Sequence, residues 1–343
     1  MTKAAELAKM GEVLTNSQIG GRRNIIINGA MQVAQRGTSS TGIGGSAGYF
    51  TLDRWQISPN GTDGRLTMTQ DSSAPSGFAN STKLACTTAD TSIAAGEFLT
   101  FTQKIEGQDL QAFAKGTSDA KTFAVSFYVK GNANVTYVAE LMDNDNSNRH
   151  VSKSFSVTTD WTRVELSFPA DTTGAFDDDN ADSMVLNIWL HAGTNFTSGS
   201  LQTTWGALSQ TSRAVGISSF FSSTSNTFFI TGVQLEVGKT TPFEHRSFGE
   251  ELNLARRYYY QPDLALRMIS MLLRPDNKRQ FQHFFPVQMR ADPTATTTYD
   301  ADGSSATLTS PIVSKDQFRA RTDALNATTQ DPRLTAFKMD AEL

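Results

Sequence analysis

A chain of 343 residues is long enough for a large β-sandwich core and a second, smaller domain. Only 19% of its residues are charged, while Ser, Thr, Asn and Gly are plentiful, a composition typical of many short strands with polar outer faces. The net charge of −4 comes from mixed acids and bases without a long basic run, which argues against nucleic-acid binding.

Targeting signals and cysteine content bear on the cellular compartment in which the protein folds. The N-terminal segment lacks the apolar core of a secretory signal peptide, and no stretch approaches the roughly 20 apolar residues of a membrane span. Cys86 is the single cysteine, so no intrachain disulfide can form. We expect a protein that folds through packing in a reducing cytoplasm, without membrane insertion.

The first predicted element is a short amphipathic helix within residues 1–22. Leu7, Met10 and Leu14 fall on one helical stripe, and two consecutive glycines interrupt the pattern soon after. A helix this short is marginal in water, so its apolar stripe needs a surface to dock on. We predict an anchor or assembly helix followed by a linker, with docking on the protein's own sandwich as the alternative.

Residues 23–246 are predicted to form a jelly-roll β-sandwich. About ten strand-like segments follow one another, separated by Gly, Asn, Asp, Ser or Pro and without helical patterns between them. Apolar and polar residues alternate in several, as in 123–129 and 164–168, so each strand has one buried and one solvated face. This pattern favours two packed antiparallel sheets. The glycine-rich stretch 36–50 is expected to be a surface loop.

The end of the sandwich and a connecting helix are predicted within residues 228–262. Alternation gives the last strand one face made of Phe229, Thr231, Val233, Leu235 and Val237. Ser247 and Glu250 then have the spacing of a capping box, which predicts a helix over 248–260 in a connector of residues 247–262.

Residues 263–343 are predicted to form a small C-terminal β domain. Five strand-like segments span about 80 residues, and partner chains are expected to complete such a small core. Just before this domain, Arg256, Arg257, Tyr258 and Tyr259 could suggest a binding patch. Because consecutive residues point around a helix, we expect them to contact a neighbouring domain or subunit instead.

The sequence offers no motif for catalysis, a cofactor or a metal. It lacks a nucleophile elbow, the H-E-x-x-H and C-x-x-C patterns, a P-loop and a dinucleotide fingerprint. His191 and His283 lie in strand patterns, and the acidic stretches 143–146 and 177–180 lack the spacing of a calcium loop. We expect a protein that is not an enzyme. Paired carboxylates can meet in space without a local motif, so a glycan-degrading enzyme stays open as an alternative.

Aromatic side chains are the remaining candidates for ligand contact. Trp161 and Trp205 lie beside predicted turns, and together with Tyr128 they could stack on sugar rings. Trp55 and Trp189 lie inside strand patterns and are expected in the core.

Several motifs distributed over the chain carry a family resemblance. They are NIIINGAMQVAQRG, YFTLDRW, KTFAVSFYVKG, TDWTRVELSF, LHAGTNFTSGSLQTTWGA, FFITGVQLEVG, FPVQMRADPT and the terminal DAEL. As a set they resemble the carbohydrate-binding-module-like jelly roll of bacteriophage tail fibre and related virion proteins. The resemblance implies a homotrimeric virion component without enzymatic activity, assembled in the host cytoplasm and exposed towards the host surface.

The function predicted from this resemblance is that of a phage tail fibre or tail appendage that recognises a host surface glycan. Its expected partners are copies of itself and other virion proteins. The alternative is a purely architectural virion protein, such as a capsid decoration or a tail adaptor, that binds no glycan.

Overall fold

The structure is a computed structural model that describes residues 3, 23–262, 272–273, 279–300, 308–322 and 333–343. The predicted anchor stripe of Leu7, Met10 and Leu14 lies outside the described residues. Among the helices that the structure describes, none is long and apolar enough to cross a membrane.

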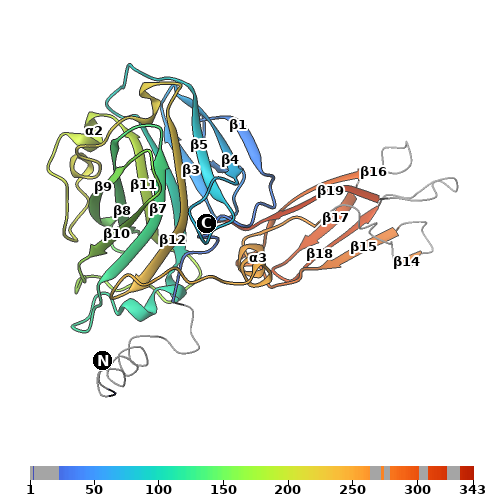
Figure 1. Ribbon diagram of the computed structural model, residues 1–343. Helices are drawn as coiled ribbons and strands as arrows, with labels where there is room; N and C mark the ends of the chain where they lie inside the picture. Colours follow the sequence, from blue (N-terminus) through green and yellow to red (C-terminus); the bar gives the residue numbers. More distant parts are fainter. Residues whose placement is uncertain (1–2, 4–22, 263–271, 274–278, 301–307, 323–332) are drawn as a thin grey trace. The chain divides into compact units, whose positions relative to one another are not determined.

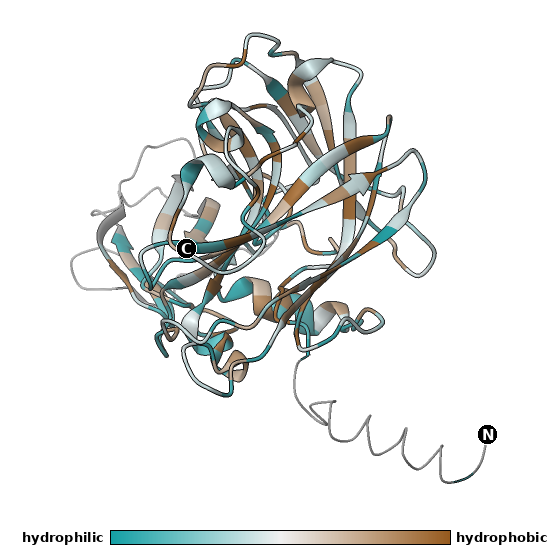
Figure 2. Ribbon diagram, turned by 90° about the vertical axis from the view of Figure 1, so that its left-hand side faces the viewer, coloured by the Kyte–Doolittle hydropathy of each residue, from teal (hydrophilic) through white to brown (hydrophobic). Residues whose placement is uncertain are grey.

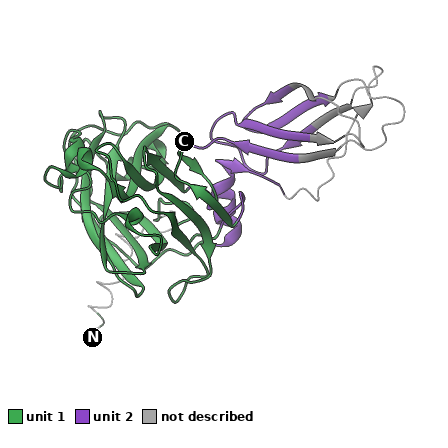
Figure 3. Ribbon diagram, turned by 90° about the horizontal axis from the view of Figure 1, so that it is seen from above, with its two compact units in different colours: residues 1–32, 38–51, 55–246 green, residues 33–37, 52–54, 247–343 purple. Residues whose placement is uncertain are grey.

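Contacts along the chain divide it into two compact units, coloured separately in Figure 3. Unit 1 comprises residues 1–32, 38–51 and 55–246, and unit 2 comprises 33–37, 52–54 and 247–343. The predicted connector 247–262 is therefore part of unit 2. This unit also takes in two short segments from the N-terminal part of the chain, which no local sequence pattern had indicated.

Unit 1 is a jelly-roll β-sandwich, which confirms the predicted fold class (Figure 1). Sheet A contains, in spatial order, β1 (Ser39–Ile43), β4 (Arg65–Asp71), β5 (Ser81–Thr88), β12 (Thr227–Val237), β7 (Phe123–Gly131) and β10 (Thr162–Phe168). Sheet B contains β2 (Gly48–Tyr49), β3 (Gln56–Asn60), β6 (Phe98–Glu106), β11 (Asp182–Ala192), β8 (Val135–Asp143) and β9 (Arg149–Val157). The paired strands in both sheets are antiparallel.

The core of unit 1 follows the predicted alternation on β10, whereas Ala124 and Ser126 on the second face of the central strand β7 are buried and not solvated as predicted. Figure 2 shows how hydropathy changes along the strands. Val125 on β7 pairs with Leu166 on β10, and both are buried. Trp55 is fully buried and stacks on Phe101 with ring centroids 4.5 Å apart, so its predicted core position is confirmed. Trp189, 1% exposed, is buried as predicted.

Two local predictions within the sandwich were wrong. The glycine-rich stretch contains β1 and β2, because an edge strand pairs through its backbone and needs few apolar side chains. The final strand does not keep one face, since its register shifts between Thr231 and Gln234, with Gly232 at a φ of +63°. Because of this bulge, Ile230 and Leu235 share the core face of β12. Strict alternation would have placed Phe229 on the same face as Leu235.

Short helices connect the strands of unit 1. They are η1 (Gly107–Asp109), η2 (Gln111–Phe113), α2 (Thr194–Thr197), η3 (Gln210–Ser212) and η4 (Phe220–Ser222). Three of them, α2, η3 and η4, belong to the long connection from β11 to β12, which packs on sheet B and helps to form the candidate site described below.

Unit 2 combines α3 (Phe248–Arg256) with two small antiparallel sheets. The three-stranded sheet contains β13 (Tyr259–Tyr260), β19 (Arg333–Asp340) and β16 (Thr294–Asp300). The four-stranded sheet contains β14 (Leu272–Leu273), β15 (Arg279–Phe284), β18 (Gln317–Thr322) and β17 (Leu308–Val313). The predicted cap is confirmed, because the Ser247 hydroxyl accepts a hydrogen bond from the backbone N–H of Glu250 at 3.3 Å.

The helix ends earlier than predicted, and the tyrosines that follow it are buried in unit 2. Tyr259 and Tyr260 form a strand because they pair with Asp340 and Met339 of β19, a partner that local sequence does not indicate.

Arginine side chains cover two of these tyrosines. The Arg54 guanidinium lies 3.5 Å from the centre of the Tyr258 ring, and that of Arg36 lies 3.6 Å from the Tyr259 ring. Glu342 forms ion pairs with both arginines. These contacts are internal to unit 2, and the backbone carbonyl of Arg257 accepts from Arg290 in the same unit. A subunit contact for Arg256, Arg257, Tyr258 and Tyr259 stays a prediction.

Candidate functional site

The outer face of sheet B carries polar side chains on its central strands. On β6, Thr100, Thr102 and Lys104 line a pocket, whereas Phe101 between them is fully buried in the core. On β11, Asn187 lines the same pocket. The alternation of a strand thus places the threonines and the lysine on one face and Phe101 on the other.

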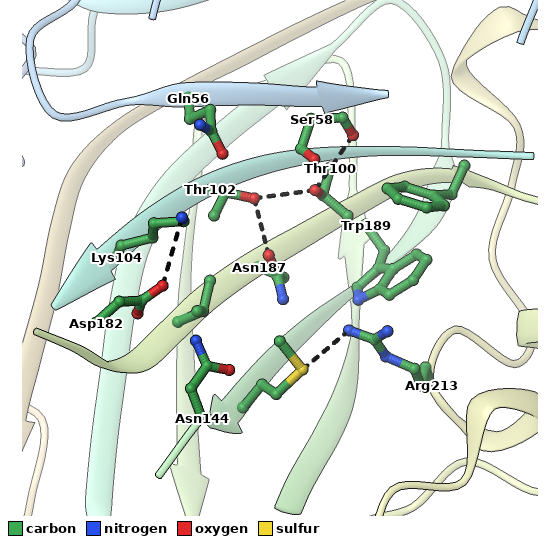
Figure 4. Close-up of a pocket in the computed structure, with 13 residues that line it drawn as sticks. Gln56, Ser58, Thr100, Thr102, Lys104, Asn144, Asp182, Asn187, Trp189 and Arg213 are labelled. Carbon is green, nitrogen blue, oxygen red and sulfur yellow. Dashed lines mark hydrogen bonds and ion pairs between the residues drawn. The ribbon is translucent and has the colours of Figure 1, made fainter. Parts of the chain in front are cut away.

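These side chains line a cavity of about 300 Å³, named here the polar pocket (Figure 4). Hydroxyl, amide and charged groups predominate, with one indole and three smaller apolar side chains. The lining residues are Gln56, Ser58, Phe98, Thr100, Thr102, Lys104, Met142, Asn144, Asp182, Val185, Asn187, Trp189 and Arg213.

A chain of hydrogen bonds fixes the polar groups in the middle of the pocket. The Thr102 hydroxyl lies 2.9 Å from the Thr100 hydroxyl and 2.8 Å from Asn187 Oδ1. The other end of that amide, Asn187 Nδ2, donates to Glu140 Oε2 at 3.0 Å. The orientation of the Asn187 side chain is therefore set by partners on both sides.

Glu140 on β8 is fully buried beneath the pocket and holds Arg213 in place. Arg213 donates from Nε and from Nη2 to the two carboxylate oxygens, each at 2.7 Å, in a two-pronged ion pair. Burial alone would raise the pKa of Glu140. The charge and hydrogen bonds of Arg213, with a contribution from His150, outweigh it and lower that pKa from 4.5 to about 2. The carboxylate is thus ionised at neutral pH.

Trp189 forms one end of the pocket and is covered by the same arginine. The Arg213 guanidinium lies 4.7 Å from the centre of the indole ring, and the Trp189 Nε1–H donates to Glu140 Oε2 at 2.9 Å. Because the guanidinium covers the indole, the ring face of Trp189 is not an open platform for a ligand. Hydrogen bonds and the ring contact therefore join Glu140, Arg213 and Trp189 into one assembly.

The connection from β11 to β12 covers part of the outer face of sheet B. Phe196, Leu201, Ala214 and Ile217 from this connection pack with Trp189 in a small apolar cluster separate from the sandwich core. The cluster positions Arg213, which precedes Ala214 in the chain. The polar pocket is the part of this face that lies beside the cluster and keeps an open cavity.

Lys104 and Asp182 lie at the side of the pocket remote from Trp189 (Figure 4). Their charged atoms are 3.4 Å apart, with side chains 27% and 20% exposed. Because Lys104 pairs with Asp182 and Arg213 pairs with Glu140, the charges in and under the pocket cancel in two pairs.

The three aromatic residues proposed from sequence as sugar-stacking groups do not line the polar pocket. Trp161 is half-buried beside β10 and meets Phe229 edge-on, with centroids 6.1 Å apart. Tyr128 is half-buried on β7, and its ring centroid is 5.3 Å from that of Phe78. Tyr128 thus lies on a strand of sheet A, and Trp161 directly precedes another, β10.

Trp205 is also held in internal contacts. Its Nε1–H donates to the carbonyl of Pro169 at 2.8 Å, and its ring centroid lies 5.4 Å from that of Phe123. The ammonium group of Lys115 lies 5.4 Å from the centre of the Trp205 ring. The three proposed residues are therefore not brought together into one site.

A lysine side chain supplies the cation for the acidic stretch 143–146. Lys115 and Asp143 are fully buried and form an ion pair, and the Lys115 Nζ also lies 3.3 Å from Asp171. Its remaining hydrogen bonds go to the carbonyls of Thr173 at 3.0 Å and Gly174 at 2.7 Å. The lysine ammonium thus supplies the positive charge for these buried carboxylates.

Sequence reasoning missed the residues of the polar pocket. The alternation Thr-x-Thr-x-Lys in 100–104 was a usable signal, since polar side chains at every second position of a central strand must face either solvent or a ligand. Arg213 left no such signal, because its partner Glu140 is 73 positions away in the sequence.

Comparisons with known proteins yield structural matches alone. No family model matches the chain, and no curated protein does. Solved structures that match include carbohydrate-binding modules and a phage tailspike. One is a CBM4 module, at 14% identity and a TM-score of 0.32, over 61% of this chain and 97% of that one.

Two further matches have similar sequence identities and TM-scores. TmCBM61 in complex with β-1,4-galactotriose matches at 10% identity and a TM-score of 0.32, over 63% of this chain and 99% of that one. The enzymatically active domain of bacteriophage CBA120 tailspike protein 4 matches at 16% identity and a TM-score of 0.33, over 62% of this chain. This match spans 21% of the tailspike chain.

Proposed function

We propose that the polar pocket binds a neutral glycan. The observation that carries the proposal is the ordered row of Thr100, Thr102 and Asn187, held by hydrogen bonds beside an open cavity of about 300 Å³. Sugar hydroxyls donate and accept hydrogen bonds, as do threonine hydroxyls and asparagine amides. Groups already fixed in position lose little conformational entropy on binding, which favours recognition of a polyhydroxylated ligand.

The charges around the pocket support a neutral ligand. Lys104 and Arg213, the two cationic side chains of the lining, are each paired with a carboxylate. An anionic sugar would have to compete with Asp182 or Glu140 for these cations. Since Arg213 covers the ring of Trp189, the ligand would be recognised mainly through hydrogen bonds rather than by stacking on an open aromatic face.

We also propose that the protein binds its glycan without cleaving it. Glycoside hydrolysis commonly needs one carboxyl group that gives up a proton near neutral pH and a second that acts as base or nucleophile. Glu140, with a pKa of about 2, is poorly suited to be the acid, and Asp182 is paired with Lys104. This arrangement supports binding over catalysis.

The biological setting we propose is a phage virion, as a tail fibre or tail appendage that contacts the host surface. The motifs of the sequence that resemble tail fibre proteins support this setting.

Removing residues 1–21 should prevent incorporation into particles while the remaining chain still folds. Unchanged incorporation of the truncated protein, measured by immunoblot of purified particles, would refute the anchor role of Leu7, Met10 and Leu14.

A homotrimer is the proposed assembly. Phe284, 67% exposed, and Ile312, 46% exposed, lie on strands of the four-stranded sheet of unit 2, and large apolar side chains with such exposure support a contact between copies. Light scattering coupled to gel filtration tests the proposal, which predicts three times the chain mass of 37.3 kDa. A stable monomer at micromolar concentration would contradict it.

A glycan array with the full chain tests the proposed ligand class. We expect binding to neutral oligosaccharides, and loss of that binding in the double variant Thr102→Ala/Asn187→Ala. The matched control is Thr69→Ala, which removes an equivalent hydroxyl from a strand of sheet A. Absence of binding to any host glycan would favour the architectural alternative. Release of reducing sugar ends by the wild-type protein would revive the enzyme alternative.

A further inference from the structure

A second polar cluster lies in unit 1 and does not line the polar pocket. Asp90 follows β5, Glu97 precedes β6, and His191 is near the end of β11. One possible ligand atom from each side chain lies within 4.8 Å of the other two. All three residues are buried, with exposed fractions of 6%, 8% and 0%. Two carboxylates and an imidazole are thus gathered where water is largely excluded.

A bulge in β11 directs His191 into this cluster. The pairing of β11 with β6 shifts by one residue between Trp189 and His191, so His191 lies opposite Leu99. Its Nδ1 is 2.8 Å from the Ser219 hydroxyl, and its ring meets Phe221 edge-on at 5.4 Å between centroids. These contacts fix the ring and leave Nε2 as the nitrogen facing Glu97.

Two of the buried atoms in the cluster lack a hydrogen-bond partner among the described residues. They are Glu97 Oε2 and His191 Nε2, which lie 3.6 Å apart. This separation is longer than a hydrogen bond, and a buried polar atom without a partner normally costs stability. Two such atoms that face each other at 3.6 Å are placed to bind one common ion.

Hydrogen bonds from neighbouring residues orient the third side chain, Asp90. Asp90 Oδ2 accepts hydrogen bonds from the Thr62 hydroxyl at 2.7 Å and from the backbone N–H of Asp63 at 2.9 Å. Its other oxygen accepts from the backbone N–H of Ser92 at 3.3 Å. Such bonds orient a carboxylate in the way that outer partners orient the ligands of a metal.

The cluster differs from the other buried acidic site of unit 1 in its source of positive charge. At Asp143 and Asp171, the ammonium of Lys115 neutralises the carboxylates. Within the described residues, neither Asp90 nor Glu97 forms an ion pair with a lysine or arginine. Two buried carboxylates without such a partner favour the binding of a cation from another source.

We propose that Asp90, Glu97 and His191 bind one divalent transition-metal ion, with Zn²⁺ as the favoured ion. Zinc accepts imidazole nitrogen and carboxylate oxygen at about 2.0–2.2 Å, which corresponds to about 3.4 Å between ligand atoms in a tetrahedron. The 3.6 Å between Glu97 Oε2 and His191 Nε2 is close to that value. Calcium and magnesium prefer oxygen ligands alone, so the imidazole disfavours them.

The role of this ion is structural. It ties the segments that follow β5 and precede β6 to the end of β11, the strand that carries Asn187 and Trp189. Binding to the folded state but only weakly to the unfolded chain raises the midpoint of thermal unfolding. The metal site would thereby stabilise the strand that forms one wall of the polar pocket, without contacting a ligand there.

Equilibrium dialysis of the full chain against Zn²⁺, after treatment with a chelator, tests the proposal. We expect one zinc per chain by elemental analysis, and a rise of about 5 °C or more in the unfolding midpoint at saturating zinc. Replacement by Co²⁺ should give visible absorption bands of a bound ion. Lack of zinc uptake by the folded wild type, or uptake of Ca²⁺ in its place, would overturn the assignment.

Variants locate the ion. Glu97→Gln keeps the shape of the side chain, and His191→Ala removes the nitrogen; each should weaken zinc binding by about 100-fold or more. Glu236→Gln is the matched control, because Glu236 is a buried carboxylate of unit 1 bonded to Thr241 and outside the cluster. Should His191→Ala not fold, Glu97→Gln decides. Zinc affinity equal to that of the wild type in folded Glu97→Gln would refute the site.

Discussion

The two outer faces of the sandwich are made by the same strand alternation but use their side chains differently. On sheet A, the aromatic groups contact one another: Trp161 meets Phe229, and the ammonium groups of Lys83 and Lys130 lie 5.5 and 5.4 Å from the centre of the Phe229 ring. On sheet B, threonines and an asparagine form a hydrogen-bonded row beside a cavity.

The difference shows that an aromatic residue near a turn is not enough to make a binding site. The ring of Trp161 packs edge-on against Phe229 of sheet A. A site arises on sheet B because the connection after β11 covers only part of that face, and because buried Glu140 fixes the groups at the border. The contrast between these faces can be tested by mutation.

Removing Glu140 should have the largest effect. Glu140→Ala leaves Arg213 without its carboxylate and Trp189 and Asn187 without an acceptor, so we expect a loss of about 3–5 kcal/mol in the free energy of unfolding. Urea unfolding measures it. The matched control on sheet A is Glu165→Ala, whose partially exposed pair with Arg163 should contribute less than about 1 kcal/mol. Equal losses in both variants would contradict the account.

The stability of unit 1 should fall with acid in a manner that depends on Glu140. Its pKa is lowered from 4.5 to about 2, so its contribution is present above pH 4.5 and is lost as the pH falls through 2. A shift of this size corresponds to about 3 kcal/mol. Urea unfolding between pH 6 and pH 2 should therefore show the difference between wild type and Glu140→Gln shrinking as the pH falls. A constant difference would show that the charge of Glu140 is not responsible.

Asn187→Ala should have an intermediate effect, mainly on binding. It removes an amide that faces the cavity, and we expect glycan affinity to fall about tenfold, with a cost of about 1 kcal/mol in stability from the lost hydrogen bonds. Isothermal titration calorimetry with the strongest ligand from the array measures the affinity. Unchanged affinity in the folded variant would exclude Asn187 from the ligand contact.

The smallest effect is expected on sheet A. Tyr128→Ala and Trp161→Ala should leave glycan affinity within a factor of about 2, because neither side chain lines the polar pocket. The same titration measures both variants. A loss of affinity in either one would reverse the comparison and move the binding site to the outer face of sheet A.

Local patterns in the sequence predicted the elements better than the site. The shared core face of Phe123, Val125, Phe127 and Val129 and the N-cap at Ser247 depend on residues close in sequence, and both are confirmed. The solvated second face predicted for 123–129 was wrong, because Ala124 and Ser126 are buried as well. The strand at Tyr259 depends on Asp340, and the position of Arg213 depends on Glu140, so these features arise only when distant segments meet. For the same reason Trp189 could be predicted as buried, but neither its cluster outside the sandwich core nor its position at the end of a pocket could be predicted.

A crystal structure of the full chain with the strongest-binding neutral oligosaccharide tests the central claim most directly. The account predicts sugar density in the polar pocket, with hydroxyl groups within hydrogen-bond distance of Thr102 and Asn187. Density on the outer face of sheet A beside Trp161, with the polar pocket unchanged from the unbound protein, would contradict it.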